Sequence, residues 1–327
     1  MSKIILLYRL QSPDRKSIEN VFKPLERLGF VHRKELPCDL KSPSDVFRLF
    51  WFAFSVKEKN IHITGDVHYM AFFLFWKKTI LTIHDCNHYE ILGGMKKWLM
   101  GFLWYRLPMK FANAITVISP FTKNQLDAHF KIAGAKTHVI PNSFIPVEKR
   151  KVVKDATGFT ILTIGSLELK NQLRLAKAIL NIPNARLCLV GRINAELKRF
   201  LELNQIDFVQ HFNIQRKELE ECYNSSDLLF FASTREGFGL PILEAQSCGL
   251  PVLTSDRSSM PFVAGNGAHL VDPYNIEEIR KSIIKIMNDN TYRVELIQKG
   301  YENTQRFSQQ QFTLSFMKLY KEVFEAQ

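Results

Sequence analysis

The chain has 327 residues, of which 46% are hydrophobic, and this length and composition favour two globular domains and exclude a disordered protein. It contains no run of about 18 apolar residues, so we expect no membrane-spanning helix. The five cysteines show no C-x-x-C spacing, which indicates reduced thiols and no zinc site. The first residues show no signal-peptide pattern, and together these features predict a cytoplasmic protein.

The net charge of +12 is concentrated in the first half of the chain. Residues 1–150 contain 23 Lys and Arg against 12 Asp and Glu, whereas the remainder contains 21 against 20. Basic and aromatic residues are interleaved over residues 96–111 (KKWLMGFLWYRLPMKF), which is typical of an interfacial membrane patch. A core helix with solvated lysines fits these residues equally well, and single-stranded nucleic acid fits them less well. We expect an anionic membrane surface, and no nucleic acid, as a partner.

Hydrophobic periodicity predicts alternating strands and helices in the first half. Strands are expected at residues 3–9, 30–33, 60–64, 78–83, 114–118 and 138–140, and helices at 17–28, 42–57, 92–112 and 119–129. This alternation indicates an open parallel α/β sheet, in which ligands bind at the carboxyl ends of the strands.

Polar residues directly follow three of these predicted strands. They are Asp66 and His68 after the third, His84 and Asp85 after the fourth, and Asn142 after the last. We favour a functional His84, because a His-Asp pair follows an apolar strand there. Asp66, His68 and Asn142 fit plain loop or strand-end residues as well as a binding role.

A polar stretch at residues 147–158 is predicted to link two domains, because the strand–helix alternation restarts after it. Strands are then expected at 159–164, 185–190, 208–210, 228–232, 252–254 and 270–273. Helices are expected at 171–180, 194–203, 215–223, 242–247, 276–289, 291–306 and 308–325.

Residues 233–255 (STREGFGLPILEAQSCGLPVLTS) concentrate the candidate chemistry. Gly237 and Gly239 precede a helix that we expect Pro241 to open at its first position. Free backbone N–H groups and the helix dipole at such a helix start favour an anion, and glycines let a phosphate approach closely. This segment therefore predicts a phosphate site.

Two glutamates flank that glycine-rich loop. We expect Glu244 in the first turn of the helix, where its carboxylate can accept hydrogen bonds from a ribose diol. Glu236 precedes the loop and can reach a group beyond the phosphates. An ordinary helix start with an acidic first turn fits the same pattern equally well.

The stretch REGFGLPILEAQSCGLPVLTS resembles the donor-binding signature of the retaining glycosyltransferases of family four, whose mark is two glutamates separated by seven residues. Further matches follow in the expected order: TIHD, TVISPFTKNQL, VIPNS, TIGSLELKN, YNSSDLLFFAS and HLVDP. The resemblance covers most of the chain, is densest after residue 159, and implies the GT-B fold.

The GT-B resemblance implies an α/β protein of two Rossmann-like domains with parallel sheets that face each other across a cleft. It implies an acceptor-binding domain at residues 1–146 and a donor-binding domain at residues 159–306. A C-terminal helix at 307–327 is expected to return to the first domain.

The resemblance also implies a nucleotide-diphosphate sugar as donor, retention of the anomeric configuration, and no metal or other cofactor. Glu236, His84 and Asp85 are the implied catalytic residues. The implied donor-binding residues are Glu244, Lys170, Gly165, Ser166, Gly237, Phe238, Gly239, Leu240 and Arg192. Asp66, His68 and Asn142 are the candidate acceptor-binding residues.

Three positions depart from the pattern of this family. Lys170 is the one basic residue of the phosphate loop, where a second is usual, and Arg192 or Arg235 can compensate. Residues 8–12 (YRLQS) replace a glycine pair that many relatives carry. Phe262 stands where a glutamate often follows proline.

The leading hypothesis is a glycosyltransferase at the inner face of the plasma membrane. It would act on a glycan or a polyprenyl-diphosphate-linked acceptor in bacterial surface polysaccharide assembly, that is, of lipopolysaccharide, O-antigen or capsule. A nucleotide-sugar-binding protein without turnover is one alternative, and a phosphorylase or epimerase of the same fold is another. The residues do not identify the base, the sugar or the acceptor.

Overall fold

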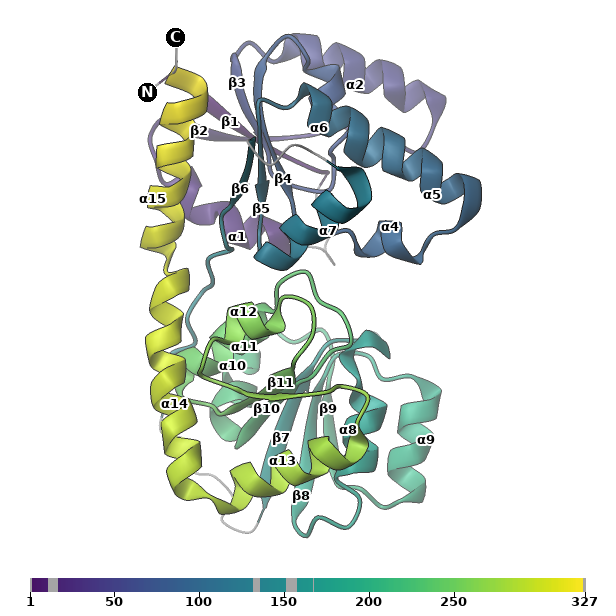
Figure 1. The fold of residues 1–327 in the computed structure, drawn as a ribbon, viewed down its shortest axis with the longest axis vertical. Coiled ribbons are helices and arrows are strands. Elements are labelled where there is room, and N and C mark those ends of the chain that lie inside the picture. The colour runs from purple at the N-terminus through teal and green to yellow at the C-terminus, as the bar shows by residue number, and fades with distance from the viewer. Residues whose placement is uncertain (1, 11–16, 132–135, 151–157, 167, 326–327) are drawn as a thin grey trace. The chain divides into compact units, whose positions relative to one another are not determined.

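The computed structural model describes residues 2–10, 17–131, 136–150, 158–166 and 168–325 (Figure 1). The chain divides into two compact units, one formed by Met1–Ser143 and Phe307–Gln327 and the other by Phe144–Arg306.

The first unit is built on a six-stranded sheet in the order β2-β1-β3-β4-β5-β6, with every pair parallel. Its strands are β1 (Ile4–Tyr8), β2 (Val31–Glu35), β3 (Asn60–Ile63), β4 (Lys78–Ile83), β5 (Ala114–Val117) and β6 (Thr137–Val139). All residues of β1, β3 and β5 are buried, as expected for central strands covered on both faces.

Helices connect these strands and cover the sheet. They are α1 (Ser17–Glu26), α2 (Pro43–Ser55), α3 (Met70–Phe73), α4 (Asn87–Ile91), α5 (Gly94–Met100), η1 (Gly101–Arg106), α6 (Leu107–Phe111), α7 (Pro120–Phe130), α15 (Gln309–Tyr320) and η5 (Lys321–Glu325). The C-terminal helix α15 packs on this unit, since the Tyr320 hydroxyl lies 2.7 Å from Nδ1 of the buried His62.

The helical region predicted at residues 92–112 is confirmed, and it is helical without a break from Gly94 to Phe111. It consists of α5, the π-helical segment η1, and α6. Gly101 begins η1 where the chain passes close to Tyr89, because a Cβ at Gly101 would lie 2.9 Å from that ring. The short helices α3 and α4 were not predicted, since four or five residues are too few to show helical periodicity.

The second unit contains another six-stranded parallel sheet, in the order β12-β11-β10-β7-β8-β9. Its strands are β7 (Phe159–Ile164), β8 (Ala185–Val190), β9 (Phe208–His211), β10 (Leu228–Phe231), β11 (Val252–Ser255) and β12 (His269–Val271). The last of these ends two residues before the predicted limit, because Asp272 and Pro273 already belong to the following turn.

Helices of the second unit lie on both faces of its sheet (Figure 1). They are η3 (Glu168–Lys170), α8 (Gln172–Ala178), α9 (Ala195–Leu203), α10 (Arg216–Ser225), α11 (Leu240–Cys248), α12 (Met260–Ala264), α13 (Ile276–Asn288) and α14 (Asn290–Thr304), followed by η4 (Gln305–Phe307). Apolar residues of α8, α9 and α13 form one core with β7 and β8. The predicted α/β class with two parallel sheets is confirmed.

Part of the predicted linker packs on the second unit. The backbone N–H of Val147 donates to Ser247 Oγ at 2.9 Å, and that of Arg150 donates to Asn224 Oδ1 at 2.8 Å. Residues 151–157 of the predicted linker lie outside the described residues.

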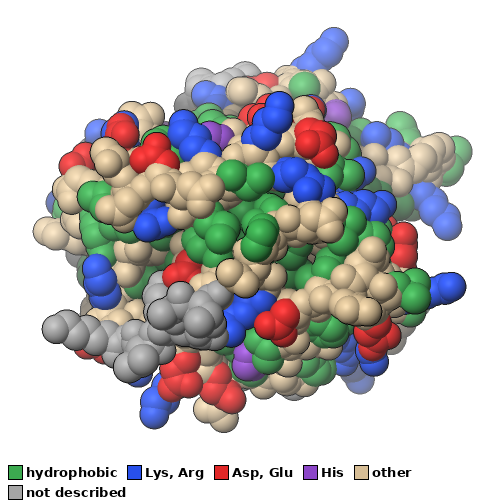
Figure 2. Space-filling view, turned by 90° about the horizontal axis from the view of Figure 1, so that it is seen from below, with side chains coloured by type: hydrophobic (Ala, Val, Ile, Leu, Met, Phe, Trp, Pro, Cys, Tyr) green, Lys and Arg blue, Asp and Glu red, His purple; other side chains and the backbone are tan. Residues whose placement is uncertain are grey.

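Among the described residues, no helix has the length and apolar character needed to cross a membrane. The face of the molecule in Figure 2 carries hydrophobic side chains among Lys, Arg, Asp and Glu side chains of both signs. This face therefore presents no continuous field of a single charge sign.

Candidate active site

Three loops meet at the carboxyl edge of the second sheet, after β7, β8 and β10. The backbone N–H of Arg192 donates to Ser166 Oγ at 2.8 Å, which joins the first two loops. The N–H of Thr234 donates to the carbonyl oxygen of Leu169 at 2.9 Å, which joins the first and third. This edge is where ligands of parallel α/β sheets bind, so the predicted phosphate loop lies at the expected place.

Gly165 allows a lysine to lie across the loop after β7. Its φ of +124° is rarely adopted by residues with a side chain, and a Cβ there would lie 2.5 Å from Cε of Lys170. Gly191 allows a similarly close approach between the loops after β7 and β8. A Cβ added at Gly191 would lie 2.7 Å from the Gly165 carbonyl oxygen. Both glycines are thus required by close packing of this edge.

Lys170 and Glu236 form an ion pair at this edge. The distance from Lys170 Nζ to Glu236 Oε1 is 2.5 Å, and both side chains are less than one fifth exposed. The ammonium also lies 4.6 Å from the ring centroid of Phe231, within the range of a cation–π contact. A cation and a carboxylate are therefore held together, partly shielded from water, beside the glycine-rich loop.

The glycine-rich loop is fixed by hydrogen bonds from a buried serine. Ser259 Oγ lies 3.1 Å from the carbonyl oxygen of Glu236 and 2.8 Å from that of Phe238, and Phe238 itself is buried. Gly239 then adopts a φ of +110° and caps the start of α11. The loop is thereby held rigid at the N-terminus of a helix, as an anion site requires.

Two predictions about α11 are wrong in detail. The helix begins at Leu240, so Pro241 is its second residue and not its first, and Glu244 lies in the second turn and not the first. The reason is that Gly239, in its left-handed conformation, already serves as the N-cap, with its carbonyl oxygen accepting from the N–H of Ile242 at 3.0 Å.

Both carboxylate oxygens of Glu244 accept hydrogen bonds from α10. Arg216 Nη1 donates to Oε1 at 2.5 Å, and the Tyr223 hydroxyl donates to Oε2 at 2.7 Å. Burial, followed by the charge of Glu244, raises the pKa of Tyr223 well above its ordinary value, so this hydroxyl stays protonated and donates. The orientation of Glu244 is therefore fixed before any ligand binds.

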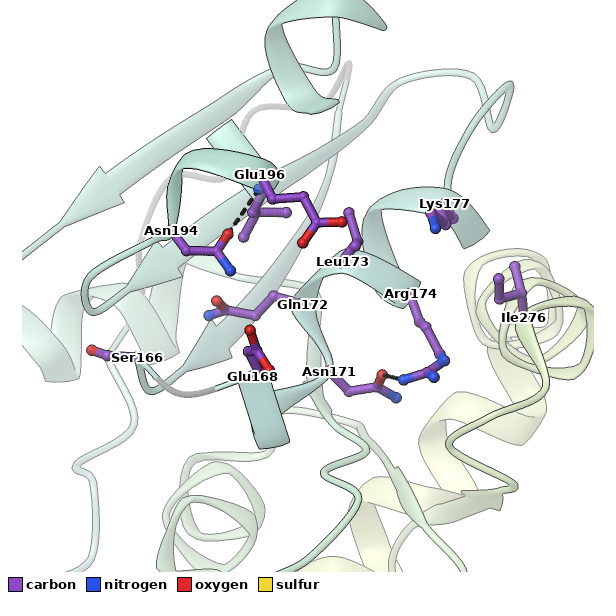
Figure 3. A pocket seen from close by; sticks show the side chains of 11 residues that line it. Ser166, Glu168, Asn171, Gln172, Leu173, Arg174, Lys177, Asn194, Glu196 and Ile276 are labelled. Atoms are coloured by element: carbon purple, nitrogen blue, oxygen red, sulfur yellow. Dashed lines mark hydrogen bonds between the residues drawn. The ribbon is translucent and has the colours of Figure 1, made fainter. Parts of the chain in front are cut away.

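A cavity of about 290 Å³ lies beside the phosphate loop (Figure 3). Ser166, Gln172 and Asn194 line it, together with the charged side chains of Glu168, Arg174, Lys177 and Glu196. Within it, Arg174 Nη1 donates to Asn171 Oδ1 at 2.9 Å. The cavity is thus polar and adjoins Ser166, a predicted donor-binding residue.

Polar side chains also gather at the carboxyl edge of the first sheet. Arg9 follows β1, and its guanidinium lies 3.3 Å from Oε1 of the buried Glu19 and 3.3 Å from Oδ1 of Asp66, which follows β3. The departure from a glycine pair after β1 therefore places a buried arginine against Asp66. Residues 11 and 12 of that departure lie outside the described residues.

His84 follows β4 at the same edge. Its Nε2 donates to the Thr64 carbonyl oxygen at 2.8 Å, which leaves Nδ1 as the acceptor of the neutral ring. Burial lowers the pKa of His84, so the neutral form is favoured. Asp85 lies beside it and accepts from the N–H of Asn87 at 2.9 Å.

The other two candidate acceptor-binding residues are buried. His68 Nδ1 donates to the Trp104 carbonyl oxygen at 3.0 Å, and burial lowers the pKa of His68 to about 4. Asn142 is also buried, and its Oδ1 has no hydrogen-bond partner among the described residues. Little of His68 is accessible to a ligand, whereas Asn142 retains an unused acceptor atom.

The sequence did not point to several residues that complete these sites. Arg9, Arg216 and Tyr223 were missed because they lie far along the chain from their partners. Asn171 was also missed, although its Nδ2 joins two loops by donating to the carbonyl oxygens of Ala232 at 3.0 Å and Pro273 at 2.6 Å. Its place directly after Lys170 in the phosphate loop was the available signal.

Two family models match consecutive parts of the chain. The model described as Glycosyltransferase Family 4 matches residues 8–145, and the model described as Glycosyl transferases group 1 matches residues 144–303. Together they cover every candidate site residue, the whole second sheet, and the first sheet except most of β1.

A curated relative and two solved structures are also similar. The O-antigen chain mannosyltransferase B of Escherichia coli is 33% identical over 105 residues, which are 32% of this chain and 28% of the relative. The chain therefore matches about a quarter of that relative's length.

The solved structures match almost the whole chain. HepE of Anabaena, in complex with UDP and glucose, matches with a TM-score of 0.78 at 16% identity. The match covers 97% of this chain and 99% of the HepE chain. WaaG, a glycosyltransferase involved in lipopolysaccharide biosynthesis, has a TM-score of 0.71 at 12% identity and covers 98% and 99%. At such low identity, these likenesses establish the fold.

Proposed function

The chain belongs to the family-four glycosyltransferases with the GT-B fold, and we propose on this premise that it transfers a sugar from a nucleotide-diphosphate sugar to a glycan or polyprenyl-diphosphate-linked acceptor. The observation that carries the proposal is the grouping of Lys170, Glu236 and the rigid loop of α11 at one sheet edge. The UDP and glucose held by HepE support a nucleotide-sugar donor.

In the proposed donor site, different residues contact the diphosphate, the ribose and the sugar of the donor. The loop from Gly237 to Leu240 faces the diphosphate, with Gly165, Ser166 and Arg192 nearby. Glu244, fixed by Arg216 and Tyr223, binds the ribose hydroxyls. Glu236 contacts the donor sugar.

The reaction we propose retains the anomeric configuration through front-side displacement. The acceptor hydroxyl oxygen forms a bond to the anomeric carbon while the bond to the diphosphate breaks and its electron pair goes to the diphosphate. The hydroxyl proton moves to a phosphate oxygen. Lys170 stabilises the negative charge that develops on the leaving group, so the reaction needs no metal.

The first unit supplies the remaining proposed contacts. His84 and Asp85 contact the donor sugar, and Asp66, His68 and Asn142 belong to the acceptor side. The fixed tautomer of His84 supports its role, because a neutral ring with a free Nδ1 can accept a sugar hydroxyl. Of the acceptor group, Asp66 is the residue with an exposed carboxylate.

A membrane surface is the proposed location of the acceptor. Large hydrophobic side chains are exposed on and after α2 and α3, namely Phe47, Phe50, Trp51, Phe54, Phe75 and Trp76. Others are exposed from α4 to η1, namely Ile91, Met95, Trp98, Leu99, Phe102 and Leu103. Burial in the core does not account for them, and their combination with a basic first half suits an anionic membrane.

We therefore place the protein at the inner face of the plasma membrane, in assembly of a bacterial surface polysaccharide. The similarity to an O-antigen mannosyltransferase and to WaaG supports this choice of pathway. Nucleic acid is not proposed as a partner.

A donor screen tests the proposal. UDP, GDP, TDP and ADP differ in the base, so a selective rise in melting temperature identifies it. The matching nucleotide sugars are then supplied with chelator present, and released nucleoside diphosphate is measured for wild type and Glu236→Gln. Glu168→Gln, an exposed neighbour, is the control.

Turnover that Glu236→Gln abolishes and Glu168→Gln preserves supports a metal-independent transferase. Selective binding with no turnover, with or without candidate acceptors, supports the nucleotide-sugar-binding alternative instead. The lone basic residue of the phosphate loop is the observation that keeps this alternative open.

The membrane proposal has its own test. Flotation with anionic vesicles at low salt should recover the wild type, and Trp51→Glu combined with Trp98→Glu should stay unbound. Leu203→Glu changes an equally exposed apolar residue of the second unit and should float like the wild type. Equal flotation of the wild type and both variants contradicts the proposed surface.

A further inference from the structure

Three potential metal ligands meet in the second unit, between strands β8 and β9 and helix α10. Cys188 of β8, His211 at the end of β9 and Cys222 of α10 each offer one ligand atom, and these atoms lie within 4.8 Å of one another. Both cysteines are free and buried, and His211 is half-buried. It is the one group of this kind among the described residues.

The strand geometry explains why these residues converge. Leu187 and Leu189 point into the core formed with α8 and α9, so Cys188 between them points to the opposite face. Cys188 pairs with Val209, and His211 lies two residues further along β9, on the same face. Helix α10 covers that face and brings Cys222 over the pair.

Two thiols and an imidazole form a ligand set that favours Zn²⁺. Thiolate sulfur and neutral imidazole nitrogen are the usual protein ligands of Zn²⁺, at about 2.3 Å and 2.0–2.1 Å from the ion. Ligand atoms within 4.8 Å of one another need to move only slightly to reach a common tetrahedral ion. Carboxylate-preferring ions such as Mg²⁺ do not suit this set.

The surroundings leave room for a fourth ligand. A cavity of about 290 Å³ is lined by all three residues together with Asp207 and Ser225. Water can therefore reach the ion, and a three-residue site can complete its tetrahedral coordination from this cavity.

We propose that Cys188, His211 and Cys222 bind one Zn²⁺ ion with a water molecule as fourth ligand. Binding replaces the two thiol protons, which are released to solvent, and involves no oxidation or reduction. The ion joins the edge strand β9 to β8 and to α10. It takes no part in the sugar transfer proposed above.

One consequence connects this site to the donor site. Helix α10 also carries Arg216 and Tyr223, which hold Glu244, and the His211 carbonyl oxygen accepts from the N–H of Gly191 at 2.8 Å. An ion at Cys222 and His211 thus holds the two elements that support the loop after β8 and the carboxylate of α11.

Cobalt and zinc titrations of the full chain test the proposal. The protein is first treated with a chelator and reduced with a phosphine. After both reagents have been removed, it is titrated with Co²⁺. We expect one equivalent to produce a thiolate-to-cobalt charge-transfer absorption, and Zn²⁺ to displace it. The absence of this absorption in reduced, folded protein overturns the proposal.

Variants assign the ligands. Cys222→Ser and His211→Gln should each bind Co²⁺ more than about 10-fold more weakly than the wild type. Even the loss of a residue that only orients a metal ligand lowers metal affinity by about this factor. Cys248→Ser replaces a buried cysteine outside the proposed site and should bind Co²⁺ like the wild type. Loss of binding in Cys248→Ser, or full binding in both ligand variants, overturns the assignment.

Melting temperatures test the site independently of the cysteine variants, which can be unstable. His211 is half-buried, so His211→Gln is expected to fold. Zn²⁺ should raise the melting temperature of the wild type and leave that of His211→Gln unchanged. An equal rise in both contradicts the site. None of these readouts requires transferase activity, so their failure is separate from failure of the proposed function.

Discussion

Lys170 Nζ lies 2.5 Å from Glu236 Oε1, and this ion pair joins the two motifs that the sequence placed in the donor site. The two residues are 66 positions apart, on the loops after β7 and β10. The carboxylate thereby holds the ammonium at the edge where the proposed diphosphate leaves.

Replacing the lysine tests this arrangement. Lys170→Gln should lower kcat/KM by a factor on the order of 10²–10³, as expected when a group that stabilises transition-state charge is lost. Binding of the nucleoside diphosphate should weaken more than that of the monophosphate, because Lys170 is proposed to meet the leaving diphosphate. Isothermal calorimetry and steady-state rates measure the two effects.

Lys177→Gln is the matched control for this substitution. Lys177 lines the cavity beside the phosphate loop, but its ammonium lies over the Phe200 ring, 6.0 Å from the centroid. Equal losses in both variants would mean that the general positive charge of the region matters and the pair with Glu236 does not.

Gly165→Ala should reproduce the loss of Lys170 without changing the lysine. The added Cβ would occupy the place of the Lys170 side chain, in a backbone conformation that alanine rarely adopts. We expect the activity of Gly165→Ala to fall, and the double variant with Lys170→Gln to be little worse than Lys170→Gln alone.

Gly29→Ala, where an added Cβ meets nothing within 4 Å, is the corresponding control. It should retain wild-type kinetics. Fully additive losses in the Gly165 and Lys170 double variant would show that the glycine does not act through the lysine.

Tyr223→Phe should destabilise the second unit by about 1.5–3 kcal/mol, the usual range for a lost hydrogen bond to a charged group. The loss leaves Glu244 Oε2 without its buried donor. Urea unfolding followed by far-ultraviolet circular dichroism measures the effect. All four tryptophans, namely Trp51, Trp76, Trp98 and Trp104, lie in the first unit, so its fluorescence transition is an internal control that should not move.

The same variant separates positioning from binding. Nucleotide affinity should fall less in Tyr223→Phe than in Glu244→Ala, because Arg216 still holds the carboxylate. If Glu244→Ala binds nucleotide as well as the wild type does, the ribose role of Glu244 is wrong.

Acidification should destabilise the first unit through His62. This ring is fully buried between Tyr320 and Thr82, and burial, followed by the charge of His84, lowers its pKa to about 3. The unfolded chain binds a proton below about pH 6.5 and the folded chain does not, so stability falls as pH decreases from 6.5 toward 3. The expected loss is about 2 kcal/mol between pH 6.5 and 5.

Tryptophan fluorescence in urea at several pH values measures this loss. His62→Gln retains hydrogen-bonding groups but does not titrate, so its stability should depend less on pH below 6.5. Above pH 7.5 the two proteins should show the same pH dependence. A variant that follows the wild type throughout the acid range would contradict a role for His62.

The sequence determined the elements that depend on neighbouring residues. The runs KTILTI, FTILTI and ARLCLV predicted β4, β7 and β8 with the observed bounds, because a short run rich in apolar and β-branched residues between turns specifies a strand locally. The glycines of the phosphate loop and of residues 237–239 likewise identified the sheet edge at which the candidate donor site lies.

Only the tertiary structure decided which side chains meet. Arg9 contacts Asp66 across 57 positions, and Tyr223 contacts Glu244 across 21. Hydrophobic periodicity records that a face is buried but not which element covers it, so these pairs could not be predicted.

The same limit applies to the cysteines. Spacing along the chain argued against a zinc site, yet Cys188, His211 and Cys222 converge because a strand, its parallel neighbour and a covering helix place them on one face. The sequence thus determined the sheets and the local loops of this glycosyltransferase. Packing between elements distant in sequence decided how its charged and metal-binding side chains are held, because such contacts depend on the register and crossing of whole elements.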